Sequence, residues 1–349
     1  MLNLLIGLGV VLILAVLYLL FRLGGAVAVV KKTDEKRETP ANNINALLLL
    51  VFFFIGTFLF IWFDREAEEH LLPVASEHGV WTDQLFWITM GVITLVFLVT
   101  NFILFWFAFR YRFRENRVAK YYPENNKLEI IWTVVPAIVL TLLVFAGFRT
   151  WSDIMYPEAP EGATIVEIKA KQFAWEIRYP GKDGQLGVYD YRLIDATNQF
   201  GIDFTDEAAM DDFMPRKIYL PKGQPVEFKI RAVDVLHSVF APHFRLKMDA
   251  VPGMPTRFLF KPTKTTAEMR LETGNPEFEY ELACTEICGR GHFAMKMLIE
   301  VLEPAEYEAW YAEQKPWAES NLDYVKEAIE KRGTNQALLN RVNEMKSSL

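Results

Sequence analysis

The chain has 349 residues, of which 52% are hydrophobic and 23% are charged, and its formal net charge is −7. The apolar residues are concentrated at the N-terminal end, which excludes a wholly soluble globular protein. The basic residues flank apolar segments, and the sequence contains neither a glycine-rich phosphate loop nor a Ser/His/Asp arrangement. A nucleic-acid partner is therefore not indicated.

Four uncharged stretches each reach the roughly 17–25 residues that a helix needs to cross the hydrocarbon core of a membrane. A long buried helix of a globular protein would carry a polar stripe, and none of these stretches does. The first one lacks a small-residue cleavage site, which favours an uncleaved anchor over a signal peptide. The sequence predicts a multi-pass membrane protein with four transmembrane helices, at 1–21, 41–63, 84–109 and 130–148.

Basic residues in short loops indicate the orientation of such a protein. The loops after the first and third stretches are basic, whereas the loop from Asp64 to Asp83 contains only Arg65. We therefore expect the basic loops in the cytoplasm of a bacterium and everything after the fourth helix on the external side of the inner membrane. Glu129 lies at the cytoplasmic start of the fourth helix, where a carboxylate is ordinarily stabilised by the helix N-terminus.

After Trp151 the chain changes to short alternating segments separated by proline and glycine. Several short strands with regular turn signals predict an all-β Greek-key barrel or sandwich. A long acidic insertion interrupts it at 191–217, and from Pro304 a helical, charged tail follows, which we expect on the surface. The predicted strands lie within 164–179, from 218, and around 226–233, 257–260, 266–271 and 297–302.

Both cysteines of the chain lie in one segment, Cys284-x-x-x-Cys288-x-x-x-His292-x-x-Met295. Thiolate, imidazole and thioether are the donors that soft copper prefers. A blue-copper site uses one cysteine, two histidines and a weak axial methionine, so this segment has one sulfur too many for a single ion. Because a thiolate can bridge two ions, the additional cysteine predicts a pair of coppers that share an electron.

Three other interpretations of the segment fit its residues less well. A disulfide would suit an external compartment but leaves His292 and Met295 unexplained. Structural zinc prefers four Cys/His ligands in close-spaced pairs, and methionine is a poor partner for it. A catalytic Cys–His pair lacks an activated nucleophile nearby. The spacing is also not Cys-x-x-Cys-His, so no c-type haem is attached to this chain.

The second imidazole has to come from elsewhere among the five histidines of the chain. His237 is expected to lie where the strand of 225–233 ends, with its ring turned inward. His243 is predicted as a rim histidine. His70 and His78 lie in an acidic loop between apolar stretches, and we expect both to be solvated and far from the external domain.

Three motifs together resemble subunit II of haem–copper cytochrome c oxidase, with a similarity that extends from about Asp83 to Trp310. They are Asp234-Val-Leu-His237-Ser, Phe244-Arg-Leu-Lys-Met-Asp249-Ala-Val-Pro-Gly253 and Cys284-Thr-Glu-Ile-Cys288-Gly-x-x-His292-x-x-Met295. The resemblance implies a cupredoxin-like external domain with a dinuclear CuA centre. Cys284 and Cys288 would bridge the coppers, and His237 and His292 would each bind one.

The resemblance also implies roles for residues beside the copper pair. Met295 would be a weak axial ligand and the carbonyl of Glu286 the other, while the Glu286 side chain would join a magnesium site shared with subunit I. Glu129, in Glu-x-x-Trp-Thr-x-x-Pro, would lie at the mouth of a proton path into subunit I. Phe173 and Trp175 occupy the aromatic cluster through which electrons enter, although the family commonly has tryptophan at the position of Phe173.

The family implies a function for the whole chain. It would accept electrons from a soluble or membrane-bound cytochrome c and pass them to haem in subunit I, where oxygen is reduced to water with proton pumping. The complete ligand set argues against the quinol-oxidising relatives. Besides cytochrome c, the expected partners are subunit I, other oxidase subunits and membrane lipid. A membrane-tethered copper-delivery protein is the rival hypothesis, and the copper count with paramagnetic resonance separates the two.

Four regions follow from this interpretation. Two additional helices would be followed by a transmembrane hairpin typical of the family, then by the CuA domain and finally by the helical tail. Their predicted ranges are 1–63, 64–150, 151–303 and 304–349.

Overall fold

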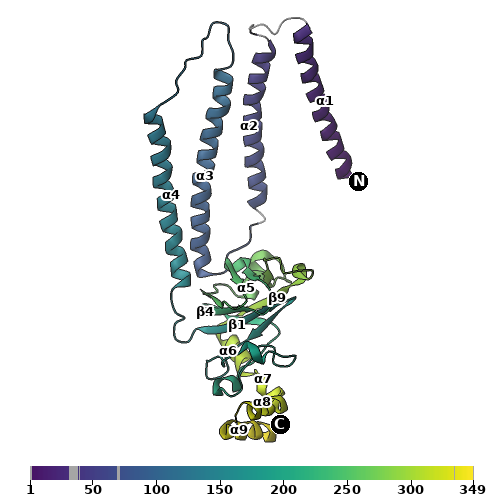
Figure 1. The fold of residues 1–349 in the computed structure, drawn as a ribbon, viewed down its shortest axis with the longest axis vertical. Helices are drawn as coiled ribbons and strands as arrows, with labels where there is room; N and C mark the ends of the chain where they lie inside the picture. Colours follow the sequence, from purple (N-terminus) through teal and green to yellow (C-terminus); the bar gives the residue numbers. More distant parts are fainter. Residues whose placement is uncertain (1, 31–37, 39, 69–70, 334, 349) are drawn as a thin grey trace. The chain divides into compact units, whose positions relative to one another are not determined.

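The structure is a computed structural model that describes all residues except 1, 31–37, 39, 69–70, 334 and 349. The chain divides into two compact units. One consists of Met1–Leu71 and Met90–Val135, and the other of Leu72–Thr89 and Pro136–Leu349. Figure 1 traces the order of the elements from α1 to α9.

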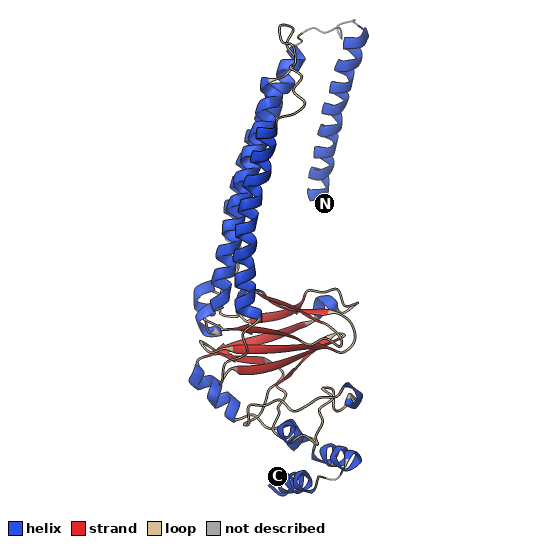
Figure 2. Ribbon diagram, turned by 60° about the vertical axis from the view of Figure 1, so that its left-hand side comes forward, coloured by secondary structure: helices blue, strands red, loops and turns tan. Residues whose placement is uncertain are grey.

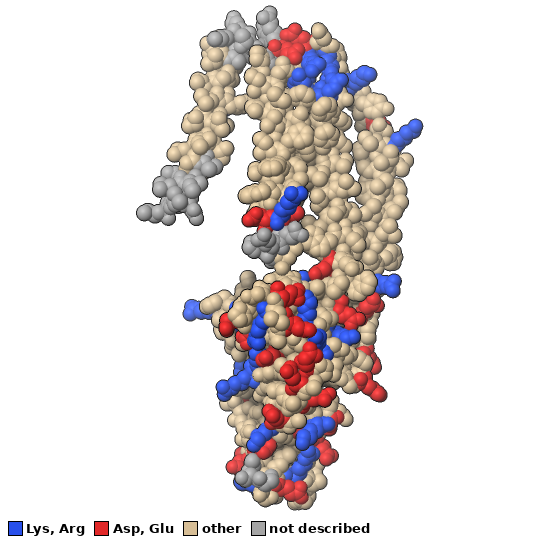
Figure 3. All heavy atoms as spheres, turned by 180° about the vertical axis from the view of Figure 1, so that it is seen from behind, with Lys and Arg blue, Asp and Glu red and all other residues tan. Residues whose placement is uncertain are grey.

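The first unit contains α1 (Leu2–Val30), α2 (Pro40–Glu68) and parts of α3 (Glu77–Arg110) and α4 (Asn126–Met155). Among the described residues, α2, α3 and α4 are long and apolar enough to cross a membrane. On the face drawn in Figure 3, these helices are tan over most of their length. The predicted helix is confirmed in α1. Its described apolar stretch is shorter than those of the other three helices, so its membrane crossing stays a prediction.

The second helix packs against the third. Phe53 of α2 is buried, and its ring centroid lies 6.2 Å from that of Phe102 and 5.4 Å from that of Phe105, both on α3. Arg112, just after α3, donates from Nε to Oδ1 of Asn43 at 2.6 Å. Aromatic packing and this hydrogen bond therefore hold one of the two N-terminal additional helices against α3.

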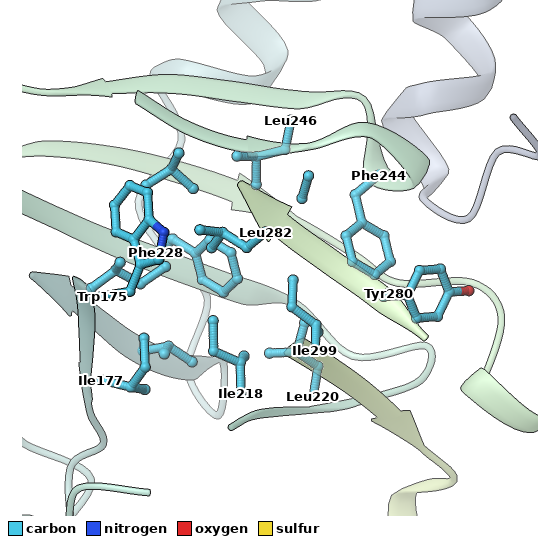
Figure 4. Close-up of a cluster of buried hydrophobic side chains, with 14 of the residues drawn as sticks. Trp175, Ile177, Ile218, Leu220, Phe228, Phe244, Leu246, Tyr280, Leu282 and Ile299 are labelled. Carbon is cyan, nitrogen blue, oxygen red and sulfur yellow. The ribbon is translucent and has the colours of Figure 1, made fainter. Parts of the chain in front are cut away.

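The β domain consists of two sheets, a four-stranded one in the order β2-β1-β4-β7 and a five-stranded one in the order β3-β9-β8-β5-β6. Figure 2 shows them as stacked red layers. Alternating apolar residues of both sheets point into one core, where Trp175, Phe228 and Leu282 lie close together (Figure 4). The strands are β1 Thr164–Lys171, β2 Ala174–Arg178, β3 Ile218–Pro221, β4 Val226–Ala232, β5 His237–Ala241, β6 Leu246–Ala250, β7 Thr256–Phe260, β8 Tyr280–Cys284 and β9 Lys296–Leu302.

Two details of the predicted strands are wrong. The segment predicted as a strand at 266–271 is helix α5 (Thr266–Thr273). Thr265 and Glu268 form a reciprocal capping box at its start, and Gly274 ends it with a left-handed φ of 64°. His237 does not end the preceding strand: β4 stops at Ala232, and His237 begins a separate strand, β5, in the other sheet.

The beginning of α3 is part of the β domain. The hydroxyl of Ser76 donates to the carbonyl of Phe244 at 2.7 Å, and Arg245 donates from Nε to Oδ1 of Asp83 at 2.7 Å. The His78 ring packs 5.3 Å from the ring of Phe258, centroid to centroid, and both of its nitrogens are buried. The expectation that His78 is solvated and far from this domain is therefore wrong, because its ring packs against β7. His70 lies outside the described residues.

The insertion and the tail form a second hydrophobic core. The tail contains α6 (Pro304–Ala312), α7 (Trp317–Ser320), α8 (Leu322–Arg332) and α9 (Gln336–Ser348), which confirms its helical character. The tail does more than lie on a surface, because it covers apolar residues of the insertion. The core residues are Phe200, Ile202, Phe204, Ala209 and Met210 of the insertion, with Ala318, Leu322, Val325, Ile329, Leu338, Leu339 and Val342 of the tail.

A buried ion-pair network fastens the insertion to the first sheet. Arg178 of β2 is 1% exposed and donates from Nη1 to Oδ2 of Asp212 at 2.9 Å. It also pairs with Glu167 of β1. Buried charges are stable only when paired and hydrogen-bonded, so this network requires the insertion to keep its place over the sheet.

Candidate metal centre

Two chain segments carry the predicted ligands. His237 begins β5, and Cys284 ends β8, which pairs antiparallel to β5 with Val239 opposite Cys284. Cys288, His292 and Met295 lie in the loop between β8 and β9. This loop returns to its start, because the Cys284 amide donates to the Met295 carbonyl at 3.1 Å. Neighbouring strands therefore bring residues distant in sequence to one end of the sandwich.

The ligand atoms converge. The two cysteine sulfurs lie 3.9 Å apart, and no disulfide joins them. Cys284 Sγ is 3.8 Å from His237 Nδ1, and Cys288 Sγ is 3.6 Å from His292 Nδ1. Metal–sulfur and metal–nitrogen bonds are about 2.0–2.3 Å long in zinc sites, so ions between these atoms can reach them with little rearrangement. The donor set thus fits a soft metal.

Two weaker donors border the pair of sulfurs. Met295 Sδ lies 3.9 Å from Cys288 Sγ, and the Glu286 carbonyl oxygen lies 3.2 Å from Cys284 Sγ. Met295 is 1% exposed and Cys288 is 4% exposed, so water hardly reaches these two sulfurs. Burial, followed by the neighbouring Cys284, raises the pKa of Cys288 to about 11. A bound cation is what would keep the Cys288 sulfur ionised at neutral pH.

The His237 ring is fixed from behind. It is fully buried, and its Nε2 lies 2.9 Å from Oδ1 of Asp234, which leaves Nδ1 facing the sulfurs. Desolvation opposes ionisation of Asp234, but hydrogen bonds from His237 and from the amides of Gln172 and Val235 outweigh it and lower its pKa. A carboxylate behind a ligating imidazole fixes the tautomer and orientation of the ring.

The sequence of this chain matches a known protein family. Residues 72–150 match the family described as cytochrome C oxidase subunit II, transmembrane domain, and residues 165–302 match its periplasmic domain. Alternative cytochrome c oxidase subunit 2 of Bradyrhizobium diazoefficiens is 35% identical over 276 residues, which are 78% of this chain and 92% of the relative. The chain belongs to the cytochrome c oxidase subunit II family. It is therefore a subunit of a haem–copper oxidoreductase complex, and a membrane protein with an extramembrane β domain.

The chain is also similar to the following two proteins. Cytochrome c oxidase subunit 2 of Thermostichus vulcanus is 28% identical over 267 residues, covering 69% of this chain and 77% of the relative. Among solved structures, the periplasmic domain of subunit II of cytochrome oxidase of Bradyrhizobium japonicum matches with 22% identity and a TM-score of 0.31, covering 45% of this chain and 95% of that one.

The aromatic residues of this subunit II lie beside the site in different ways. Trp175 is 5% exposed, donates from Nε1 to the Met295 carbonyl at 3.3 Å, and has its ring centroid 6.2 Å from that of His237. Phe173, in the turn between β1 and β2, is 41% exposed and covers Gly289 and Gly291. Phe173 therefore offers surface, whereas Trp175 supports the loop from inside.

Two other residues considered in the sequence, His243 and Glu129, lie away from the cysteine sulfurs. His243 is half-buried and packs with its ring centroid 5.1 Å from that of Phe278, which places it at the other end of β5. Glu129 lies in the first turn of α4, in the other compact unit, and its Oε1 accepts from the Asn125 amide at 3.5 Å. Gln172 was missed by the sequence reasoning. Its position directly before the aromatic pair is the only signal in the sequence.

Proposed function

We propose that His237, Cys284, Cys288 and His292 hold a dinuclear copper centre that receives electrons from a cytochrome c. The observation that carries this proposal is the symmetric arrangement of two sulfurs 3.9 Å apart, each with one imidazole Nδ1 within 3.8 Å. The two thiolates and the two imidazoles would together hold the copper pair. When bound, the copper pair supplies one-electron redox chemistry with the charge spread over two ions.

The protein contributes rigidity to this chemistry. Copper prefers different geometries in its two oxidation states, so ligands that cannot move keep the rearrangement during electron transfer small. His237 and Cys284 stand on paired strands, and the Cys288–Met295 loop is held by hydrogen bonds to the Cys288 and Met295 carbonyls. Burial excludes water, which would otherwise reorganise around the changing charge.

Further ligands fit the same proposal. Met295 and the Glu286 carbonyl would add two weaker donors to this ligand set. The Glu286 side chain is exposed, which suits a magnesium ion whose other oxygen ligands come from subunit I. The electrons would continue to haem in subunit I, where oxygen is reduced to water with proton pumping.

Cytochrome c, soluble or membrane-bound, would approach through Phe173, the more exposed of the two aromatic residues, with Trp175 behind it. The net charge of −7 favours a basic donor. By the distribution of basic loops, the copper domain lies on the periplasmic side of a bacterial inner membrane. Glu129 would then lie on the cytoplasmic side, at a proton path into subunit I.

We also retain the four predicted regions, with the first boundary moved from 63 to 68, where α2 ends. The additional helices would precede the hairpin, which leads into the copper domain at 151–303, and the tail would begin with α6 after residue 303.

The test is rapid mixing of the purified oxidase with reduced cytochrome c, monitoring haem reduction. Cys288→Ser removes one bridging sulfur and should abolish fast haem reduction while assembly with subunit I is retained. Gln185→Met, in an exposed loop beyond the far end of β2, is the control and should behave as wild type. Fast haem reduction in Cys288→Ser would contradict the proposal.

A further inference from the structure

Gln172 lies in the turn between β1 and β2 and makes two hydrogen bonds in different directions. Its backbone amide donates to Oδ2 of Asp234 at 2.7 Å, and its side-chain amide donates to the carbonyl of Cys288. The other oxygen of Asp234 lies 2.9 Å from Nε2 of His237. One residue thus contacts both the segment that orients His237 and the loop that carries Cys288.

This double contact matters because the two segments have few other links. In the described part of the chain, β5 and β8 are paired only at Val239 opposite Cys284 and Phe240 opposite Ala283. Beyond Cys284 the ligand loop leaves the sheet, and its first residue is tied back by the Thr285 amide to the Ser238 carbonyl at 3.2 Å. Cys288 itself lies beyond this tie, so its carbonyl needs a partner from another part of the domain.

Phe173 completes the contact of the turn with the loop. A Cβ atom added to Gly291 would lie 2.5 Å from Phe173 Cγ, and one added to Gly289 would lie 2.9 Å from Phe173 Cζ and 3.0 Å from Gln172 Nε2. Contacts under 3.0 Å essentially do not occur, so a side chain at either glycine would push Phe173 away from the loop. The turn between β1 and β2 is therefore fitted to the ligand loop by shape as well as by hydrogen bonds.

We propose that Gln172 is a positioning residue that couples the two halves of the metal centre and holds the Cys288 sulfur in register with His237. This inference rests on the proposed copper centre. Without the side-chain bond, the Cys288 backbone is free to rotate, and the two sulfur–imidazole pairs lose their equivalence. One hydrogen bond contributes about 1 kcal/mol net, so its loss should make the release of copper roughly fivefold faster than in wild type.

The test uses the intact oxidase with Gln172→Met, which keeps the length of the side chain and removes its amide, and with Gln185→Met as the matched control. Two quantities are measured: the rate of copper release to a Cu(I) chelator and the copper hyperfine pattern in paramagnetic resonance. We expect roughly fivefold faster release and an unequal hyperfine splitting in Gln172→Met. The control should match wild type in both. If Gln172→Met does not assemble, Gln172→Asn, whose amide falls short of Cys288, is measured with the same expectations.

A merely structural role for Gln172 would lower thermal stability without changing the hyperfine pattern. Wild-type release and an unchanged spectrum in Gln172→Met would overturn the coupling, as would a changed release rate with an unchanged spectrum. A different result would contradict the proposed function: a wild-type oxidase that contains no copper pair in this subunit.

Discussion

Replacing Gly291 by alanine tests whether Phe173 presses on the ligand loop. The new Cβ would lie 2.5, 2.7 and 2.8 Å from three atoms of Phe173, about 1 Å closer than ordinary contact. The φ of Gly291 is −90°, which alanine adopts readily, so the effect arises from packing and not from backbone strain. Overpacking of this kind costs about 2 kcal/mol, which corresponds to a roughly 30-fold weaker retention of copper.

The assay is competition for copper between the oxidase and a chelator of known affinity. Phe173→Ala combined with Gly291→Ala removes the clash and should recover most of the lost affinity. Gly147→Ala is the matched control, since its nearest neighbour would be 3.8 Å away in Leu85. Unchanged copper affinity in Gly291→Ala, or a double variant no better than the single one, would refute the reasoning.

Three further predictions concern other parts of the chain. Glu129→Ala should lower turnover and proton uptake while copper content stays normal, measured with a pH indicator in reconstituted vesicles; unchanged uptake would remove Glu129 from the proton path. Desolvation, opposed by the Arg178 guanidinium, raises the pKa of Asp212 to about 7, so the native state holds a proton that the unfolded state releases. Stability therefore falls as pH rises from about 4 to about 7, and thermal unfolding of Asp212→Asn should show a flatter pH dependence than wild type. The Trp317 ring stacks on that of Phe204 at 5.3 Å, centroid to centroid, so Trp317→Ala should cost about 3 kcal/mol and expose the insertion to proteases, with copper binding intact. Equal protease resistance of wild type and variant would contradict a shared core of insertion and tail.

Much of the architecture could be predicted from the sequence. The transmembrane helices are long uncharged runs, and this signal needs no knowledge of tertiary contacts. The ligand loop could be recognised because Cys284, Cys288, His292 and Met295 are close together in the chain. The strands β1, β2, β4 and β9 follow alternating or β-branched patterns that local sequence displays.

What could not be predicted depends on contacts between distant residues. The run 266–271 begins with a threonine, which suits a strand, but the capping box of Thr265 and Glu268 stabilises a helix there. His237 was placed on the wrong strand because the break after Ala232 carries no proline or glycine. The tail and the insertion each look polar, and their shared core appears only when Phe204 meets Trp317.

The His78 prediction failed for a related reason. Its sequence neighbours are acidic and polar, which suggests a solvated loop, yet the start of α3 is bonded to the β domain through Ser76 and Asp83. Gln172 was missed because a glutamine in a turn is ordinarily a surface residue. Only the positions of Asp234 and the Cys288 carbonyl on either side of it reveal its contacts.

The most direct test of the account is to count copper in this subunit of the purified oxidase and to record the paramagnetic resonance of the same sample. The account predicts two coppers per chain beyond those of the partner subunits, with one unpaired electron shared equally between them. A single labile copper with a localised signal would contradict it and favour a delivery protein.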